Sequence, residues 1–300
     1  MLQAKLLSDG SPCGPLEQGV WIDVETPIPE DLEILKRYPI NSLALADAQE
    51  IGHWSRFEAY PGHLFLILRT LETPYKTRSR TERVSFFYFP ERQVVLTYRN
   101  EHVQYLEDEW NSFRGAECLR LWQRLLDRGV ETFFDYVEGL TDRVEDLEEK
   151  ALAQEGDDVS REVFGVRREV LTTRRLVSQA REALIHLERL PALGTDAYLF
   201  RDLTDRMGRV YEGLDAARDE LSNVLEVHLS AQNNRLSKVV QNLTVISTIF
   251  LPLSLWAGIY GTNFETFREY QWPYGRVFFW LGLLAIGGSL AYWMKRRGWW

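Results

Sequence analysis

The sequence predicts an α+β soluble domain that continues through long helices into two C-terminal transmembrane helices. Residues 1–100 contain short β-branched and aromatic runs between turn signals. Residues 101–238 are rich in charge and hold a single proline, Pro191. Two apolar runs, residues 239–260 and 277–294, contain 22 and 18 residues. A helix needs about 20 apolar residues to cross ~30 Å of hydrocarbon, so both runs predict membrane spans.

The first hundred residues predict four strands and two short helices. Residues 63–71 are almost wholly apolar and follow the turn pair Pro61-Gly62, so we expect a buried strand there. Residues 83–89 and 93–98 are β-branched and aromatic and flank a turn at Pro90, which predicts a hairpin. The other expected elements are a strand over 19–24 and helices over 29–38 and 41–50.

The middle of the chain predicts long helices. Apolar residues recur at helical spacing over 119–152, and a second helix is expected over about 160–190, ending at Pro191. A third begins near Asp196 and meets no breaker until Pro252. At 1.5 Å per residue it would extend roughly 95 Å, which predicts a stalk continuous with the first span. Such a helix needs partners, from this chain or from other subunits.

Charge and cysteine content narrow the classes of partner. Residues 241–300 carry five basic and two acidic side chains, so the whole-chain charge of −9 leaves −12 on residues 1–240. Nucleic-acid binding needs basic patches that replace counterions, so nucleic acid is excluded as a partner. The acidity is compatible with cations, and equally with solubility alone. Cys13 and Cys118 form no metal-type spacing or disulfide framework, which suits a reducing, cytosolic setting.

No enzyme motif stands out. The sequence contains no Gly-rich phosphate loop, His-Glu-x-x-His or Gly-x-Ser-x-Gly, so we expect no catalytic residues and no organic cofactor. The acids of residues 145–149 indicate a solvated helix face, with a second cytosolic cation site as the alternative. The five histidines are scattered, and we expect each to be solvated or packed: His53, His63, His102, His186 and His228.

Basic residues beside the spans predict the orientation in the membrane. Arg235 and Lys238 precede the first span, and the basic tail of residues 295–300 follows the second. The positive-inside tendency places both termini in the cytoplasm, and the outer loop of residues 261–276 on the far side. The N-terminus lacks an apolar core of signal-peptide length. We therefore expect a multi-pass protein of the plasma (inner) membrane, surrounded by lipid.

The first span carries a stripe of small and polar residues that an anchor does not need. Ser and Thr hydroxyls bond back to their own helix at low cost, so helix packing is the alternative explanation. A narrow polar stripe also suits a helix that lines a water-filled path. Two helices cannot enclose such a path, so several subunits would have to surround an axis. The stripe comprises Ser237, Thr244, Ser247, Leu251, Ser254 and Gly258.

The outer turn after the first span carries the more specific signal. Gly261 lies where a left-handed helix cap is expected. Asn263 offers a neutral amide oxygen where a pore would open, although an ordinary turn residue is the simpler interpretation of an Asn alone. Magnesium holds its water shell tightly at ~2.0–2.1 Å, so a ring of amide and carbonyl oxygens can recognise the hydrated ion without stripping it.

The outer turn also resembles a known family. Residues 258–265, read Gly-Ile-Tyr-Gly-Thr-Asn-Phe-Glu, lie between two terminal spans and precede a basic tail. This arrangement resembles the CorA family of divalent-cation (magnesium and cobalt) channels, which carries Gly-Met-Asn at the outer end of its first span. Residues 247–253 resemble the core of that span. The resemblance covers nearly the whole chain.

The resemblance implies a homopentameric funnel with a cytosolic α/β domain and a pore-lining first span. It implies a selectivity filter at Gly261, Thr262 and Asn263, and a hydrophobic constriction at Val240, Leu243 and Leu251. Magnesium would be both transported and regulatory, with cobalt and nickel as further cargo. The regulatory metal would bind Asp47 and Asp202, which would face each other across a subunit boundary and hold the channel closed.

One departure from the family motif leaves the identity of the transported ion undecided. Thr262 replaces the family's methionine, and relatives of the ZntB type also vary this residue and transport zinc. The outer-loop acids Glu265 and Glu269, with Phe264, resemble the magnesium and cobalt branch. The alternatives are therefore a zinc transporter of the same fold, possibly proton-coupled, and a membrane-tethered coiled-coil protein that conducts nothing.

Overall fold

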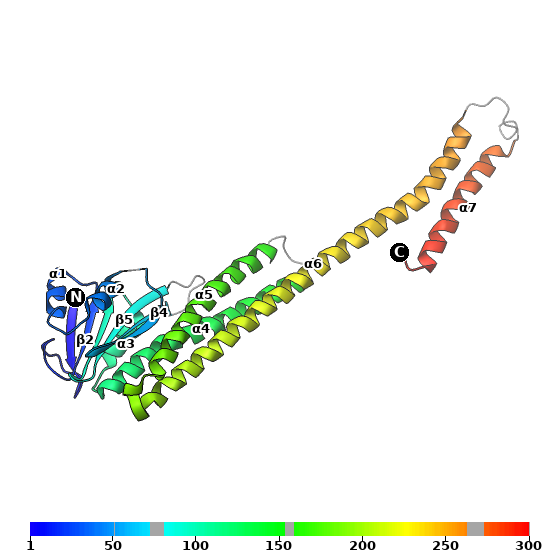
Figure 1. The fold of residues 1–300 in the computed structure, drawn as a ribbon. Coiled ribbons are helices and arrows are strands. Elements are labelled where there is room, and N and C mark those ends of the chain that lie inside the picture. Colours follow the sequence, from blue (N-terminus) through cyan, green and yellow to red (C-terminus); the bar gives the residue numbers. More distant parts are fainter. Residues whose placement is uncertain (51, 73–80, 154–158, 263–272, 300) are drawn as a thin grey trace. The chain divides into compact units, whose positions relative to one another are not determined.

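A six-stranded mixed sheet forms the centre of the N-terminal part of the chain (Figure 1). The computed structural model describes residues 1–50, 52–72, 81–153, 159–262 and 273–299, apart from the side chain of Ala192. The strands lie in the order β1-β2-β6-β5-β4-β3; β2 and β6 are parallel, and the other neighbours are antiparallel. Their bounds are β1 (Leu2–Leu6), β2 (Val20–Glu25), β3 (Arg56–Tyr60), β4 (His63–Leu71), β5 (Thr81–Phe89) and β6 (Val94–Arg99).

The sequence predicts the four inner strands of this sheet and misses its two edges. The inner strands β2, β4, β5 and β6 are almost fully buried and carry the apolar runs that marked them. The expected hairpin is present, and its turn closes with the backbone N–H of Gln93 donating to Pro90 at 3.3 Å. Edge strands pack on fewer neighbours, so β1 and β3 carry mixed side chains and no such run.

Helices α1 (Pro29–Leu35) and α2 (Ser42–Gln49) pack on one face of the sheet. Alternate side chains of each inner strand point to this face, as the two-residue period of a strand requires. The shared apolar core includes Val20, Ile22 and Val24 of β2 and Phe87 and Phe89 of β5. It closes on Leu35, Ala44 and Ala48 from the two helices.

Helices α3 (Gln104–Ser112) and α4 (Cys118–Ala153) pack on the opposite face. Tyr88 of β5 stacks on Trp122 of α4, with ring centroids 4.8 Å apart and planes at 3°. Trp21 meets Trp110 of α3 edge to face at 4.7 Å. A Cβ on Gly129 would lie 2.7 Å from the Leu68 side chain, so this glycine allows α4 to approach the sheet closely.

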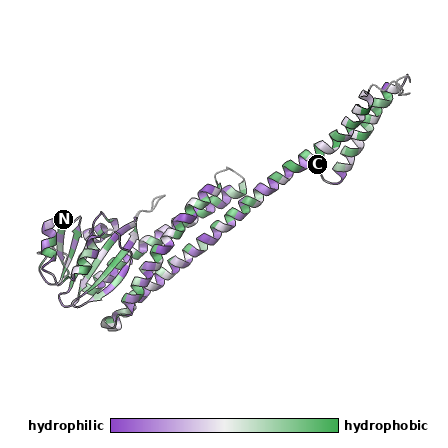
Figure 2. Ribbon diagram, turned by 45° about the horizontal axis from the view of Figure 1, so that its top comes forward, coloured by the Kyte–Doolittle hydropathy of each residue, from purple (hydrophilic) through white to green (hydrophobic). Residues whose placement is uncertain are grey.

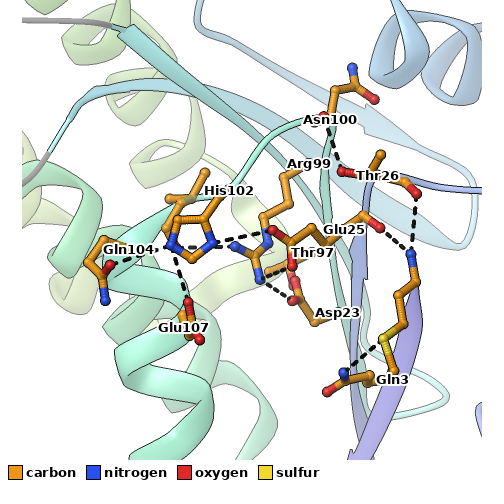
Figure 3. A network of polar contacts seen from close by, with 12 residues as sticks. Gln3, Asp23, Glu25, Thr26, Thr97, Arg99, Asn100, His102, Gln104 and Glu107 are labelled. Carbon is orange, nitrogen blue, oxygen red and sulfur yellow. Dashed lines mark hydrogen bonds and ion pairs between the residues drawn. The ribbon is translucent and has the colours of Figure 1, made fainter.

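A buried polar network lies beneath α3 and joins β2 to β6 (Figure 3). The Arg99 guanidinium contacts the Asp23 carboxylate at 2.8 Å, and their side chains are 4% and 9% exposed. The Thr97 hydroxyl donates to the same carboxylate at 2.6 Å. Asp23 is therefore buried but compensated by a charge partner and a hydrogen bond, as buried charges require.

Three long helices form a bundle beside the sheet. They are α4, α5 (Val159–Glu188) and the first part of α6 (Tyr198–Gly261), and a short 3-10 helix, η1 (Pro191–Ala197), joins α5 to α6. Trp122 of α4 packs on Phe200 of α6 with ring centroids 5.4 Å apart. Polar pairs lie around this core, including Arg174 Nε with Asp215 at 2.7 Å. The helices expected over 119–152, 160–190 and from residue 196 are thus present.

The contacts divide the chain into two compact units. The first comprises residues 1–150 and 155–225, and the second residues 151–154 and 226–300. The second unit contains the C-terminal part of α6 and helix α7 (Gly275–Arg296). Both helices are long and apolar enough to cross a membrane. Only 6% of the 18-residue apolar stretch in each is buried. Figure 2 shows the hydrophobic colouring of both segments.

Candidate functional site

One face of the first apolar segment is occupied by α7. A Cβ on Gly282 would lie 2.6 Å from the indole of Trp256, so the absence of a side chain lets this ring lie against α7. The same indole N–H donates to the carbonyl of Phe279 at 3.3 Å. Further along, Val245 and Met294 are buried. These contacts define the packed face of α6.

The predicted pore residues lie on the opposite face. Each residue of an α-helix advances ~100° round the axis, which places the centre of the predicted stripe roughly half a turn from Val245 and Trp256. Every one of these residues is exposed, and the Leu251 side chain is 77% exposed. The structure thus leaves the whole face clear of α7. Its members are Ser237, Val240, Leu243, Thr244, Ser247, Leu251, Ser254 and Gly258.

Threonine hydroxyls in this span bond to their own helix. The Thr244 hydroxyl donates to the carbonyl of Val240 at 2.8 Å, and the Thr248 hydroxyl donates to Thr244 at 2.7 Å. This satisfies their donors in an apolar setting, and each oxygen keeps acceptor capacity. Thr244 can therefore lie on a face toward lipid or toward water.

The outer end of α6 differs from expectation in one respect. Gly261 is the last helical residue and does not adopt the left-handed conformation predicted for it. Thr262 closes the helix instead, because its hydroxyl donates to the carbonyl of Ile259 at 2.6 Å. The backbone N–H of Thr262 donates to the same carbonyl at 3.3 Å. Asn263, Glu265 and Glu269 lie outside the described residues.

Asp47 lies near the end of α2, on the face of the sheet that α1 and α2 cover. The Asn41 side chain caps the start of this helix by accepting from the N–H of Leu43 at 2.9 Å. At the other end, the Arg83 guanidinium donates to the carbonyls of Asp47, Ala48 and Glu50, and so provides donors where a helix ends. The Asp47 carboxylate forms an ion pair with Arg56.

Asp202 lies in the second turn of α6 and is exposed. It lies near Asp127 of α4, which contacts Arg206. Burial raises the pKa of Asp127, and the Arg206 guanidinium opposes that rise. Since α4 and α6 pack beyond the other face of the sheet, Asp47 and Asp202 lie on opposite sides of it. One chain does not bring the two predicted regulatory ligands together.

A group that the sequence analysis missed lies beside Asp47. His53 Nε2 is 3.2 Å from the Asp47 carboxylate and 3.0 Å from that of Glu50. One ligand atom from each of these residues lies within 4.8 Å of the other two. The signal available in the sequence was the spacing Asp-x2-Glu-x2-His, which converges only because α2 ends at Gln49.

The basic tail follows α7 and turns back toward α6. Lys295 and Arg296 occupy the last turn of α7, and Gly298 takes a left-handed φ of 72° that ends the helix. The turn brings the Trp299 carbonyl within 3.2 Å of the Gln241 side chain, which donates to it. The tail cations therefore lie at the same end of the helix pair as Arg235 and Lys238.

Comparison with known proteins identifies the family. The model of the family described as CorA-like Mg²⁺ transporter protein matches residues 17–296. A putative metal ion transporter YfjQ of Bacillus subtilis is 27% identical over 291 residues, covering 93% of this chain and 89% of the relative. The cobalt/magnesium transport protein CorA of Thermotoga maritima is 36% identical over 102 residues, covering 33% of this chain and 28% of the relative.

A zinc relative and a solved structure complete the comparison. The zinc transport protein ZntB of Pectobacterium carotovorum is 26% identical over 113 residues, which are 37% of this chain and 35% of that protein. The structure of the CorA magnesium transporter from Methanocaldococcus jannaschii superposes with a TM-score of 0.84 at 21% identity, covering 100% of this chain and 99% of that one. Its fold is that of the present chain. The chain therefore belongs to the CorA family, and it is a divalent metal ion transporter and not an enzyme.

Proposed function

We propose that several copies of this chain surround a common axis and conduct hydrated divalent cations along the exposed stripe of α6. The observation that carries the proposal is the position of that stripe. Its six residues, with Val240 and Leu243 beside them, lie on the face away from α7, and they include hydroxyl groups and Gly258, beside which a Cβ would meet nothing within 4 Å. A membrane anchor would bury this face in a helix contact or make it uniformly apolar.

Five copies are the number that the family resemblance implies. A closed ring makes every interface equivalent, so a two-helix chain can contribute one wall of a shared path. Val240, Leu243 and Leu251 would form the apolar constriction, and Asn263 the ring of amide oxygens at the outer mouth. The basic residues at the cytosolic end support an inner-membrane orientation with both termini inside.

Magnesium is the cargo we propose first, with cobalt and nickel as further ions. An amide ring accepts hydrogen bonds from the waters of a hydrated cation, and this suits an ion that dehydrates reluctantly. We further propose that cytosolic magnesium closes the channel by bridging Asp47 of one subunit and Asp202 of the next. Their positions on opposite sides of the sheet support a site shared between subunits.

Zinc transport is the second candidate, and the likeness to a zinc transport protein favours it. The deciding experiment measures flux of Mg²⁺, Co²⁺, Ni²⁺ and Zn²⁺ into proteoliposomes, with and without a proton gradient. We expect Mg²⁺ to enter without a gradient. Zn²⁺ uptake that depends on the proton gradient would favour a proton-coupled zinc transporter. Liposomes that stay tight to every divalent ion would overturn both.

A further inference from the structure

Two histidines of the first unit each lie between two carboxylates. His53 contacts Asp47 at 3.2 Å and Glu50 at 3.0 Å. His102 contacts Glu25 at 3.4 Å and Glu107 at 3.2 Å (Figure 3). The two groups share residue types and similar distances. They differ in which atoms of the imidazole ring make the contacts.

The two carboxylates around His102 approach different ring nitrogens. Glu25 faces Nδ1, whereas Glu107 and, at 3.4 Å, the side-chain oxygen of Gln104 face Nε2, so the two carboxylates approach different nitrogens. A protonated imidazole has one N–H on each nitrogen and satisfies both carboxylates in this way. The opposite directions also prevent one ion from contacting all three side chains. This group is explained as an ion-paired histidine.

The carboxylates around His53 both approach the same nitrogen, Nε2. That nitrogen carries at most one N–H, which the two carboxylates would have to share. A cation in place of the proton would be shared by the nitrogen and both carboxylates. Asp47, Glu50 and His53 form the one such convergent group among the residues that the structure describes.

The ligand set favours transition metals over magnesium. Imidazole nitrogen suits zinc, cobalt and nickel, whereas magnesium prefers an octahedron of oxygens at 2.0–2.1 Å. One imidazole with two carboxylates supplies three protein ligands, and this leaves at least one coordination position for water. Glu50 is 70% exposed, so water reaches the site directly.

The surrounding groups hold the three side chains in place. The Arg83 guanidinium donates hydrogen bonds to the carbonyls at the end of α2, and the Arg69 side chain donates to the carbonyl of His53 at 2.8 Å. Arg56 contacts the Asp47 oxygen that does not face His53. Groups outside the ligand shell orient ligands in this manner, and the nearby guanidinium charges moderate the affinity.

We propose that Asp47, Glu50 and His53 of one subunit bind a first-row transition-metal cation such as Zn²⁺ or Co²⁺. The site lies within a single chain and is separate from the amide ring at the outer mouth. It rests on the proposed function only through Asp47, which would also serve the shared magnesium site. Bound transition metal would therefore occupy a ligand of that site, so each ion would weaken binding of the other.

The test measures metal binding by the full chain in detergent, so its result does not depend on conduction. Wild-type protein is titrated with Zn²⁺ by calorimetry and with Co²⁺ by visible absorption, in the presence of millimolar Mg²⁺. We expect His53→Gln and Glu50→Gln to weaken binding at least about tenfold and to change the Co²⁺ spectrum. The matched control, His102→Gln, should leave affinity and spectrum unchanged.

The outcomes separate a metal site from an ion pair. Wild-type affinity and an unchanged Co²⁺ spectrum in both His53→Gln and Glu50→Gln would overturn the proposal. An equal loss in His102→Gln would overturn it too, because that geometry holds no shared ion. If His53→Gln fails to fold, Glu50→Gln alone decides, since its side chain is exposed. Failure of this binding test would not affect the outcome of the proteoliposome flux assay, and absence of flux in that assay would not affect metal binding here.

Discussion

The two units of the chain differ in their apolar side chains, which are mostly buried in the first unit and mostly exposed in the second. In the first unit, large side chains such as Trp21, Phe87 and Trp122 are completely buried, and the buried charges of Asp23 and Arg99 are paired. In the described part of residues 226–300, Val245 and Met294 are the buried apolar side chains. Leu251 and Phe250 are 77% and 64% exposed. The first unit is stabilised by its own core, whereas the second leaves its apolar side chains exposed, and in the proposed function lipid and further copies would cover them.

The largest effect should come from the outer mouth of the second unit. Replacing Asn263 by Ala removes the amide oxygen from every copy at once, so we expect divalent-cation uptake to be abolished. Oligomer size, measured by size-exclusion chromatography with light scattering, should not change, because the side chain is proposed to contact hydrated ions. Normal flux in this variant would show that the selectivity ring lies elsewhere.

A second prediction concerns how the first unit controls the second. Neutralising both proposed regulatory ligands, as Asp47→Asn with Asp202→Asn, should leave the channel open at high internal magnesium. The cause would be the loss of the charges that bridge neighbouring subunits. Flux is measured as a function of internal Mg²⁺, with Glu91→Gln on the exposed turn as the control that spares both aspartates. Inhibition at the wild-type concentration in the double variant would place the sensor at other residues.

The same contrast explains what the sequence could predict. The inner strands were predictable because burial on both faces imposes apolar runs, and the α6 stripe because a helix repeats its faces every 3.6 residues. The edge strands β1 and β3 carry no such constraint. The His53 group was not predictable, since Asp47 and His53 would lie about 240° apart on a continuous helix. They converge only where α2 ends and the loop turns back.

Removing one half of the buried ion pair tests whether the first unit stands on its own core. Arg99→Ala leaves the Asp23 carboxylate buried without its partner, which should destabilise this unit by about 3–5 kcal/mol. Chemical unfolding of the full chain in detergent measures the change. The exposed pair of Lys36 and Glu33 gives the control, and Lys36→Ala should have little effect. Equal effects would mean that burial of the Asp23 pair adds nothing.

A buried carboxyl makes the stability of the first unit depend on pH. Burial, with Glu101 and Glu72 adding to it, raises the pKa of Glu82 from 4.5 to about 7. The folded state then binds the proton more tightly than the unfolded chain. Protonated Glu82 therefore contributes its full stabilisation of the folded state below pH 4.5. This contribution, up to about 3 kcal/mol of unfolding free energy, is lost as the pH rises to about 7.

Substitution of Glu82 isolates its contribution to the pH dependence of stability. Glu82→Gln keeps the shape of the neutral acid and cannot ionise, so its stability should be nearly flat between pH 5 and pH 8, in contrast to the wild type. Thermal unfolding at a series of pH values measures the slope, and Glu91→Gln on the exposed turn is the control. A wild-type slope in Glu82→Gln would assign the pH dependence to another group.

The smallest effect separates the two faces of the second unit. Gly282→Ala places a methyl group 2.6 Å from the Trp256 ring, so the ring or the two helices must shift, which should cost about 1–3 kcal/mol. Gly258→Ala meets nothing within 4 Å and should leave the helix pair of each chain intact. Thermal unfolding in detergent should therefore respond to Gly282→Ala, while cation flux responds to Gly258→Ala. If Gly258→Ala changed neither flux nor assembly, the clear face of α6 would contact only lipid, and the conducting path would have to follow another surface.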